Sequence, residues 1–213
     1  MLRGFERSSS VIGGIRQVAY LFRLPPRIAL FYVRALAIAL RAGDRRSMVG
    51  SSRPRELAAL LKVAKGKRSV VEIGTGTAWT SIALVLSDKL RHVSTYDPLA
   101  YDERQLYLEL LNESGRARLD LIAGYGHNPR DQDDSPDLVF IDSSHEHDET
   151  MQTFTVWASR LAPGGTIAFH DYGDPAWPGV KQAIEDLGLT GDARGYLFIW
   201  SPTTQDQLAR TSA

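Results

Sequence analysis

From about residue 51 onward, short runs of β-branched and aromatic residues alternate with stretches of helical spacing. Each run is too short for a helix, and its composition indicates a buried strand. The runs lie at 69–73, 92–96, 118–123, 137–141, 166–170 and 196–200, and the helical patterns at 55–63, 78–87, 102–112, 147–161 and 180–187. Strands that alternate with helices form a parallel sheet through right-handed crossovers, with both faces covered. We therefore expect an α/β fold: a Rossmann-like, doubly wound, mostly parallel sheet with helices on both faces.

Residues 1–47 precede this alternation and predict an N-terminal helical extension. An amphipathic helix is expected at 16–24, where a Pro-Pro pair ends it, and a second helix at 27–42. Residues 48–200 would form the main domain. The last segment, 201–213, has the composition of a flexible tail.

Arg27, Arg34 and Arg41 recur every seven residues and therefore form one stripe on an otherwise apolar helix. We expect this helix to pack on the main domain or on a second subunit of a homo-oligomer, because buried apolar faces usually serve packing. A lid over the substrate and a weak contact with a membrane surface are the alternatives.

The composition excludes several kinds of chemistry. The chain of 213 residues has no cysteine, so thiolate nucleophiles, disulfides and cysteine-ligated metal sites are ruled out. Its net charge of zero argues against nucleic acid as the main partner, although residues 1–50 carry nine arginines against two acids. The most apolar run, 28–40, is too short to span a bilayer and contains Arg34. We therefore expect a cytoplasmic protein without a transmembrane segment.

Polar or glycine-rich segments follow five of the predicted strands. Sheets of this kind bind ligands at the carboxyl ends of their strands. The segments are Glu72-Ile73-Gly74-Thr75-Gly76-Thr77 after the first strand, Asp97 after the second, Gly124-Tyr125 after the third, Asp142 after the fourth and His170-Asp171 after the fifth. The first three would hold a nucleoside, and the last two would hold the reacting group.

The glycine segment alone fits more than one class of cofactor. Glycines let the backbone approach a ligand closely, and the start of the following helix offers free N–H groups to an anion. Asp97 stands twenty-three positions after Gly74, where an acid can accept both hydroxyls of a ribose. A dinucleotide fingerprint, however, has a third glycine at the position of Trp79. A nicotinamide-dependent oxidoreductase is therefore one alternative, and a non-catalytic cofactor-binding or scaffold protein is another.

Taken together, these motifs resemble those of the class I S-adenosylmethionine-dependent methyltransferases. Residues 72–77 look like their first motif, and Tyr96-Asp97 looks like their second. Within the class, the chain is most similar to small O-methyltransferases of the catechol and macrocin types. Residues 48–61 resemble the helix that precedes their first motif, and residues 161–172 resemble their Pro-Gly-Gly turn and fifth strand. The resemblance covers about residues 48–200 and implies methylation of a small-molecule hydroxyl.

The resemblance also implies roles for the residues at the strand ends. Asp97 would bind the ribose hydroxyls, and Tyr125 would lie near the adenine. Asp142 would serve both the cofactor and the reaction. The residues that would cradle the methionine part of the cofactor are Glu72, Gly74, Thr75 and Gly76.

In such relatives a divalent metal is held by an acid after the fourth strand and by a pair after the fifth. Asp142 matches the first position, and His170-Asp171 matches the pair. A histidine suits zinc, iron or nickel better than magnesium, which prefers oxygen ligands. The resemblance therefore implies a divalent metal on Asp142, His170 and Asp171, although the histidine puts magnesium in doubt. Hydrogen bonding without a metal is the alternative.

His145 occupies the position, three residues after the strand-four acid, at which catechol-type enzymes have a lysine base. Methyl transfer from a sulfonium requires that the acceptor hydroxyl lose its proton, and an imidazole with a pKa of about 6.5 can take it at neutral pH. The expected catalytic residues are therefore His145, Asp142 and His170.

Other residues near these motifs have less specific patterns. His147, Asp148 and Glu149 are expected in the solvated first turn of a helix, where acids suit the helix dipole. Trp79 and Trp177 would line an acceptor pocket or cover the edge of the sheet.

Overall fold

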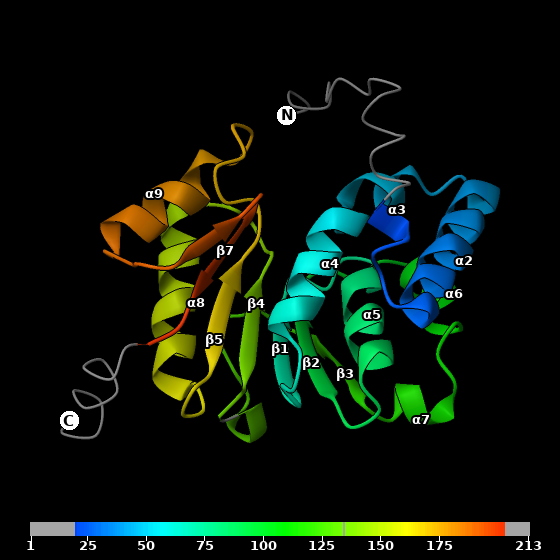
Figure 1. Ribbon diagram of the computed structural model, residues 1–213, viewed down its shortest axis with the longest axis horizontal. Helices are drawn as coiled ribbons and strands as arrows, with labels where there is room; N and C mark the ends of the chain where they lie inside the picture. Colours follow the sequence, from blue (N-terminus) through cyan, green and yellow to red (C-terminus); the bar gives the residue numbers. More distant parts are fainter. Residues whose placement is uncertain (1–19, 134, 203–213) are drawn as a thin grey trace.

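The computed structural model describes residues 20–133 and 135–202, and it contains one seven-stranded sheet (Figure 1). The strand order is β3-β2-β1-β4-β5-β7-β6. The first five strands run parallel, and the last two are antiparallel additions at one edge. The strands are β1 (Ser69–Ile73), β2 (His92–Asp97), β3 (Leu119–Ala123), β4 (Leu138–Ile141), β5 (Thr166–Phe169), β6 (Asp192–Arg194) and β7 (Leu197–Trp200). The predicted mostly parallel, doubly wound sheet is confirmed.

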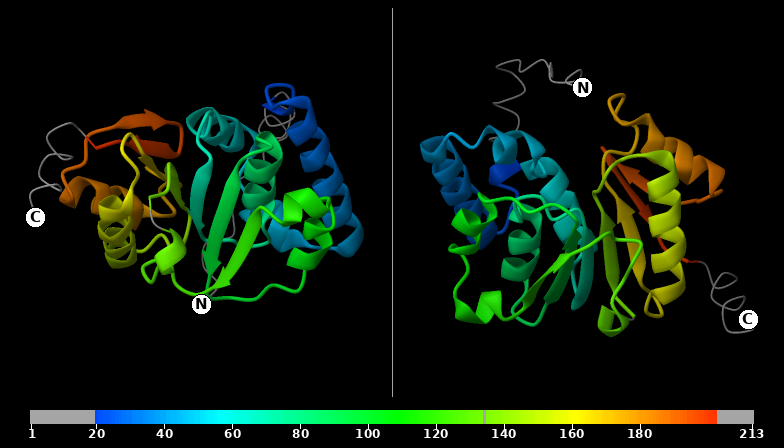
Figure 2. Two further views of the ribbon diagram at one scale, coloured as in Figure 1. Left: turned by 90° about the horizontal axis from the view of Figure 1, so that it is seen from below. Right: turned by 180° about the vertical axis from the view of Figure 1, so that it is seen from behind.

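Alternating residues of the central strands contribute to two separate hydrophobic cores, one on each face of the sheet. Val70 belongs to the core beneath α2 (Pro26–Ala42), α4 (Pro54–Val63), α5 (Trp79–Ser87) and α6 (Arg104–Leu108). Its neighbour Val71 belongs to the core beneath α8 (His147–Arg160) and α9 (Pro178–Asp186). The rear view in Figure 2 shows α8 on the face opposite to α4 and α5. This two-sided burial is why β4, with the sequence LVFI, is continuously apolar rather than alternating.

The sheet reverses its winding between β1 and β4, which lie side by side although more than sixty residues separate them. The chain runs outward from β1 through β2 to β3 and then returns to the other side of β1 for β4. Loops that leave β1 and β4 at this point diverge to opposite faces and leave a crevice at the carboxyl ends of the strands. The fold therefore places the end of β1 next to the end of β4.

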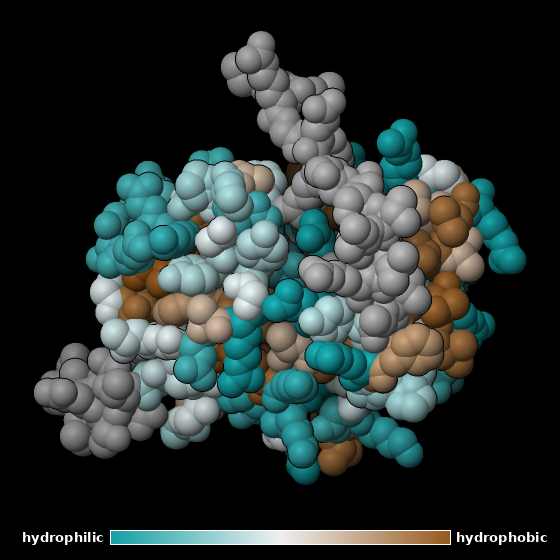
Figure 3. Space-filling model, turned by 45° about the horizontal axis from the view of Figure 1, so that its top comes forward, coloured by the Kyte–Doolittle hydropathy of each residue, from teal (hydrophilic) through white to brown (hydrophobic). Residues whose placement is uncertain are grey.

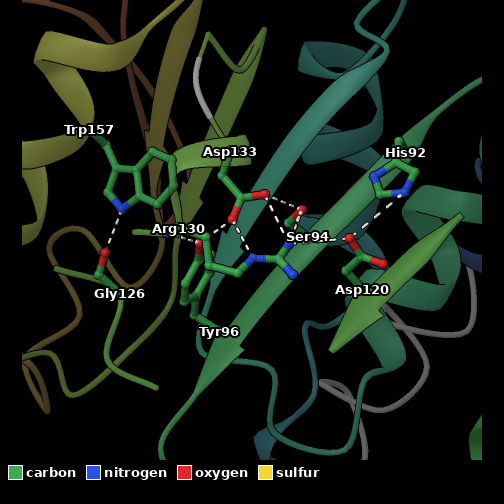
Figure 4. Close-up of polar contacts among 8 residues, drawn as sticks. All are labelled: His92, Ser94, Tyr96, Asp120, Gly126, Arg130, Asp133 and Trp157. Carbon is green, nitrogen blue, oxygen red and sulfur yellow. Dashed lines mark hydrogen bonds and ion pairs between the residues drawn. The ribbon is translucent and has the colours of Figure 1, made fainter. Parts of the chain in front are cut away.

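A polar network covers the face of β2 and β3 on the side of α8. In the β3–β4 connection the structure has a short 3₁₀ turn, η1 (Asp131–Asp133), in place of a covering helix. Arg130 contacts both Asp133 and Asp120, and Asp133 accepts hydrogen bonds from Ser94 and Tyr96 (Figure 4). These contacts raise the pKa of Arg130. For Asp133, burial opposes ionisation, but the hydrogen bonds from Arg130 and its neighbours lower the pKa overall. The network fixes the loop that leads to β4.

The N-terminal helix α2 lies where the sequence predicts it and packs against α5. Its buried side includes Ile28, Phe31 and Ala35. These residues belong to the hydrophobic core on the face of the sheet that α4 and α5 cover. On its outer side Arg27, Arg34 and Arg41 are all exposed, as are the apolar residues Leu30, Val33 and Leu40. Figure 3 shows apolar side chains gathered on this side of the molecule. None of the described helices is long and apolar enough to cross a bilayer. Residues 16–19 of the predicted helix at 16–24 and residues 203–213 of the predicted tail lie outside the described residues.

A short helix, α3 (Arg45–Gly50), connects α2 to the cofactor-motif loop through a buried polar contact. Asp44 caps α3 by accepting a hydrogen bond from the Ser47 backbone N–H at 2.9 Å, and it also accepts one from the Tyr107 hydroxyl at 2.6 Å. The Ser47 hydroxyl donates to Thr77 Oγ1 at 2.8 Å. Since Thr77 follows the second glycine of the first motif, the described part of the extension is tied directly to that motif.

Two expectations about local structure are wrong. The helix predicted at 102–112 is confined to α6 (Arg104–Leu108), and a separate short helix, α7 (Glu113–Arg116), follows the predicted range. Asn112 accepts a hydrogen bond from the Gly115 backbone N–H at 2.9 Å and so begins a new helix there, as short polar side chains often do. Strand β6 was not predicted because its three residues are exposed and carry no apolar pattern.

Candidate functional site

A cavity of about 680 Å³ opens at the carboxyl ends of β1, β2 and β4. This volume is within the usual range for small-molecule sites. Residues from all five predicted strand-end segments were expected at this edge, and four of the segments contribute to its lining, through Gly74, Asp97, Tyr125 and Asp142. His170 and Asp171 do not line the cavity itself but contact Asp142, which does.

The glycine loop after β1 passes very close to the end of β4. Gly74 has a φ of +100°, and a Cβ atom built on it would lie only 1.8 Å from the backbone oxygen of Asp142. Gly76 has a φ of +50°, but a Cβ there would meet nothing within 4 Å. Gly74 is therefore required by both its backbone conformation and the lack of space, whereas Gly76 is required by its conformation alone.

Trp79 begins α5 at the position where a dinucleotide fingerprint has its third glycine. It is buried, and it forms edge-to-face contacts with Tyr32 and Tyr107 at centroid distances of 5.3 and 5.2 Å. It also lines the cavity. In a dinucleotide site, a glycine at this position lets the helix and the strand approach closely. Here a large aromatic ring occupies the space between them instead.

Glu72 lies beneath the glycine loop rather than in the cavity lining. Its carboxyl accepts hydrogen bonds from Thr95 Oγ1 at 2.7 Å and from the Ser81 hydroxyl. Burial raises the pKa of Glu72 to about 8, although the two hydroxyl donors act in the opposite direction. In this structure Glu72 supports the loop from below, and a direct contact with the cofactor stays a prediction.

Asp97 ends β2 and faces the cavity from the side opposite to β4. Its Oδ2 accepts a hydrogen bond from the Gly76 backbone N–H at 2.8 Å, and its Oδ1 accepts one from Leu99 at the same distance. Arg104 lies 3.6 Å from the carboxylate and donates to the Gly76 carbonyl at 2.8 Å. Sequence reasoning missed Arg104, because nothing in the local pattern indicates that α6 folds back onto the glycine loop.

Tyr125 borders the cavity from the loop after β3. Half of its surface is exposed, and its ring stacks on His127 at a centroid distance of 5.3 Å. The next residue, Gly126, accepts a hydrogen bond from Trp157 Nε1 at 2.7 Å (Figure 4). The loop that would border an adenine is therefore held from α8 as well as from the Arg130 network.

A second group of polar residues lies where β4 and β5 end. His145 Nε2 is 3.3 Å from Asp142 and 3.1 Å from Asp171. His170 Nδ1 is 2.9 Å from Asp142 and 3.5 Å from Asp171. The other nitrogen of His170, Nε2, lies 3.3 Å from the carboxylate of Glu56 on α4. We refer to Asp142, His145, His170 and Asp171 as the β4–β5 cluster.

Charge in this cluster is balanced by close pairing. Burial opposes ionisation of Asp142, His145 and His170, but the pairing of their charges outweighs it. The hydrogen bonds from Asp142 and Asp171 raise the pKa of His145 to about 9, and Asp142 raises that of His170 well above its usual value. The two imidazoles lower the pKa of Asp142 in turn. The expectation of an ordinary pKa for His145 is therefore wrong for the unliganded protein, in which this imidazole is protonated at neutral pH.

His147, Asp148 and Glu149, at the start of α8, were expected together in a solvated first turn but lie in two different environments. His147 and Asp148 lie outside the cavity lining, and His147 bridges to Asp186 on α9 at 2.9 Å. Glu149, expected in the solvated turn with them, lines the cavity. Trp177 also lines the cavity and stacks on the His145 ring at a centroid distance of 4.7 Å. Glu56 was missed, because Arg53 at the start of α4 is not one of the residues that mark a capping box in a sequence.

Comparison with known proteins agrees with this arrangement. A family model described as a methyltransferase domain matches residues 71–172. No curated protein matches the sequence. The described sheet resembles those of several solved structures, each less than a fifth identical to this chain, so the likeness itself concerns the fold.

Three of these structures illustrate the range. The methyltransferase PaMTH1 from Podospora anserina, bound to S-adenosylhomocysteine, has a TM-score of 0.63 at 15% identity, covering 91% of this chain and 97% of its own. The Bacillus cereus O-methyltransferase bound to the same ligand has a TM-score of 0.57 at 17% identity, with coverages of 79% and 88%. TomG, an O-methyltransferase from Streptomyces achromogenes bound to S-adenosylmethionine, has a TM-score of 0.57 at 18% identity, with coverages of 81% and 90%.

The family match lies on the segment that supplies the glycine loop, Asp97 and the β4–β5 cluster. The mostly parallel sheet with helices on both faces is the one expected from the sequence. Residues 71–172 therefore form a methyltransferase domain, and the described sheet has the fold of the S-adenosylmethionine-dependent methyltransferases of known structure.

Proposed function

We propose that this enzyme transfers the methyl group of S-adenosylmethionine to a hydroxyl oxygen of a small molecule. The observation that carries the proposal is that one cavity is lined both by Gly74 and Asp97 and by Asp142 and His145. Groups suited to a nucleoside cofactor and groups suited to a hydroxyl acceptor therefore face the same space. The solved structures of similar fold include O-methyltransferases from Bacillus cereus and Streptomyces achromogenes.

We assign the cofactor to the half of the cavity formed by β1, β2 and the loop after β3. Thr75 and the two glycines beside it would surround the methionine part, with Glu72 supporting them from below. The Asp97 carboxylate would accept hydrogen bonds from the ribose hydroxyls, and Tyr125 would contact the adenine. Closely spaced donors and acceptors on rigid strand ends hold a ligand with little loss of freedom on binding.

We assign the acceptor to the half of the cavity that is lined by Asp142, His145 and Trp177. Asp142 would orient the acceptor hydroxyl, and His170 would hold Asp142 in place. Trp177 covers one face of the His145 ring, so the acceptor would approach that imidazole from the other side. Alignment of the acceptor oxygen with the methyl carbon and the sulfur leaving group would provide much of the rate enhancement.

His145 is the proposed base, and its pKa sets a pH dependence. A base must be unprotonated to accept the acceptor proton, and the paired imidazole is half protonated at a pH of about 9. The rate of methyl transfer should therefore rise with pH from neutrality toward that value. Replacement His145→Gln should remove the rise, whereas His147→Gln should leave it in place. A pH–rate profile that is flat in the wild-type enzyme would show that another group takes the proton.

The function can be tested by measuring the formation of S-adenosylhomocysteine across a panel of catechols, phenols, sugars and other hydroxyl compounds. Calorimetric titration with S-adenosylhomocysteine would establish cofactor binding separately. Binding with turnover on at least one hydroxyl compound is the expected result. Turnover confined to amine, thiol or carbon acceptors would contradict the proposed acceptor class but not the methyltransferase chemistry.

We further propose that residues 48–200 form the methyltransferase domain and that the N-terminal extension acts on it as a cap. The support is the Asp44–Ser47–Thr77 contact, which links the extension to the glycine loop. Replacement Ser47→Ala removes the link to Thr77, and it should weaken S-adenosylhomocysteine binding more than Ser114→Ala, a change of the same kind on exposed α7. Equal affinity in both variants would contradict a role for the extension in the cofactor site.

A further inference from the structure

The outer side of the N-terminal helices carries exposed apolar and basic side chains that the proposed function does not use. We propose that this surface, the α2 face, attaches the protein to the anionic headgroup region of a lipid membrane. The α2 face comprises the exposed residues of the segment 22–46. Figures 1 and 2 both show α2 at the periphery of the molecule, on the side away from α8 and α9. Such attachment would be independent of the cofactor and of methyl transfer.

The first component of the α2 face is a row of large apolar side chains. Leu30, Val33 and Leu40 are 60%, 50% and 63% exposed, and Phe22, in the turn before α2, is 87% exposed. At 100° per residue, the three helical positions lie opposite the buried side of α2. They therefore take no part in packing α2 onto the main domain. A contiguous exposed apolar row of this kind marks a surface that another molecule covers.

The second component is a row of arginines beside the apolar row. Arg27, Arg34 and Arg41 recur every seven residues, an interval that turns a straight helix by only about 20° from one to the next. Every exposed charged side chain of the segment 20–50 is an arginine, because its one acid, Asp44, is buried. Within the described ranges, none of the three arginines forms an ion pair. The positive charge of the α2 face is therefore uncompensated.

The two rows together fit an anionic membrane surface. A helix at such a surface lies parallel to it, with apolar side chains among the acyl chains and basic side chains at the headgroups. The apolar stem of an arginine lets its guanidinium reach the headgroup phosphates while neighbouring apolar side chains insert. Since none of the described helices is long and apolar enough to cross a bilayer, the contact would be peripheral.

A second copy of the chain fits the α2 face less well. A symmetric dimer would place this face against itself, because both partners use the same surface in a two-fold contact. The arginines of one protomer would then meet those of its partner, and the segment 20–50 offers no exposed acid to pair with them. Like charges brought together in this way repel.

The α2 face is already formed in the free protein. Ile28, Ala35 and Ala39, on the other side of α2, are completely buried, and Gly43 ends the helix with a φ of +68°. The helix therefore does not have to fold when it meets a membrane, unlike a free amphipathic peptide, so no ordering cost reduces the affinity.

Co-sedimentation with lipid vesicles tests the proposal on the full-length protein. One set of vesicles contains phosphatidylcholine alone, and the other contains equal parts of phosphatidylcholine and phosphatidylglycerol. We expect binding to the anionic vesicles and much weaker binding to the neutral ones. Binding should fall as NaCl is added, because salt screens the attraction between arginines and headgroups. Equal binding to both kinds of vesicle, or no binding to the anionic ones, would overturn the proposal.

Replacement of the arginine row locates the contact. Each arginine near an anionic surface strengthens binding by about five-fold, so the triple variant Arg27→Gln, Arg34→Gln, Arg41→Gln should bind anionic vesicles about 100-fold more weakly. A control variant with the same change in net charge should retain most of the affinity. It carries Gln in place of three exposed lysines outside the α2 face, Lys62, Lys65 and Lys181. Equal losses in the two variants would show that net charge, rather than the α2 face, governs binding.

Replacement of the apolar row tests insertion. Glutamine forms helices well, so the double variant Leu30→Gln, Leu40→Gln should keep the melting temperature of the wild type but bind anionic vesicles about 10- to 100-fold more weakly. Unchanged binding would show that no apolar side chain inserts. Sedimentation velocity without lipid tests the second copy. A wild-type dimer that this double variant dissociates, together with no vesicle binding, would assign the α2 face to self-association.

The outcome can be separated from that of the proposed function. None of the replaced residues lines the cavity, so the triple arginine variant should bind S-adenosylhomocysteine as the wild type does. Absence of methyl transfer in a protein that binds anionic vesicles would count against the proposed function alone. Methyl transfer by a protein that ignores those vesicles would count against the membrane contact alone.

Discussion

Replacement Gly74→Ala tests the packing on which the whole crevice depends. The added Cβ would lie 1.8 Å from the backbone oxygen and 2.6 Å from the carbonyl carbon of Asp142, and 3.2 Å from the Cα of Ser143. Real Cβ contacts are essentially never shorter than 3.0 Å, so the ends of β1 and β4 must move apart by about 1.2 Å. All three atoms belong to backbone, so no side-chain rotation can relieve the contact.

Two separate costs add in this variant. An alanine held in a left-handed conformation costs roughly 1–2 kcal/mol relative to glycine. Overpacking of a closely packed region costs about a further 1–3 kcal/mol. The expected loss is therefore about 2–5 kcal/mol, a large part of the roughly 5–15 kcal/mol by which proteins of this kind are stable.

Gly66→Ala separates the two costs. Gly66 has a φ of +78°, but a Cβ there would meet nothing within 4 Å, and the residue lies between α4 and β1 away from the cavity. Urea unfolding followed by circular dichroism should show a loss of about 1–2 kcal/mol for this control, from backbone strain alone. Calorimetry should show unchanged affinity for S-adenosylhomocysteine.

Gly74→Ala should lose more stability than the control and should also lose most of its affinity for S-adenosylhomocysteine, because the displaced loop carries the proposed cofactor contacts. If Gly74→Ala loses no more stability than Gly66→Ala, the ends of β1 and β4 are not in contact as described. If its cofactor affinity is also unchanged, the assignment of this loop to the cofactor is refuted.

Three further predictions concern residues around the same cavity. Asp97→Asn keeps an acceptor for the Gly76 N–H but removes the charge that would bind ribose hydroxyls. Calorimetry should therefore show an affinity for S-adenosylhomocysteine that is weaker by about 10- to 100-fold. Unchanged affinity would exclude Asp97 from the ribose site. Burial raises the pKa of the Glu72 carboxyl to about 8 from an ordinary value near 4.5. The folded state therefore binds the carboxyl proton more tightly than the unfolded state does. The contribution of Glu72 to stability is complete below about pH 4.5 and is lost as the pH rises through about 8. The unfolding free energy of the cofactor-free wild type, measured relative to Glu72→Gln, should fall across this range, and a constant difference would argue against the raised pKa. Arg130→Ala leaves the buried Asp133 carboxylate without its cation. The unfolding free energy measured in urea should therefore fall by about 1–3 kcal/mol. An unchanged unfolding free energy would mean that solvent replaces Arg130 without loss.

The sequence predicted the central fold because the burial pattern of each strand is local information. The runs that became β1, β2, β4 and β5 are buried on both faces, and their apolar, β-branched and aromatic residues are readable without any tertiary contact. The peripheral elements lack such a signal. Strand β6 is fully exposed, and it exists because β7 offers it an unpaired edge.

Candidate site residues were predictable to the extent that they follow strands directly. Asp97, Asp142 and the His170-Asp171 pair could be found from position alone. Glu56 and Arg104 could not, because each reaches the site from a helix that precedes or follows it by many residues. Their roles depend on how α4 and α6 lie over the sheet, which is decided by packing between elements.

The sequence by itself therefore determined the class of fold, the order of the central strands along the chain and the residue types at each strand end. The tertiary structure alone decided the contacts and the pKa values of those residues. His145 has an ordinary pKa as an isolated imidazole, but the fold brings Asp142 and Asp171 within 3.3 Å of its ring and raises that pKa to about 9. Electrostatic energies depend on distance and burial rather than on separation along the chain, and only the folded molecule fixes both.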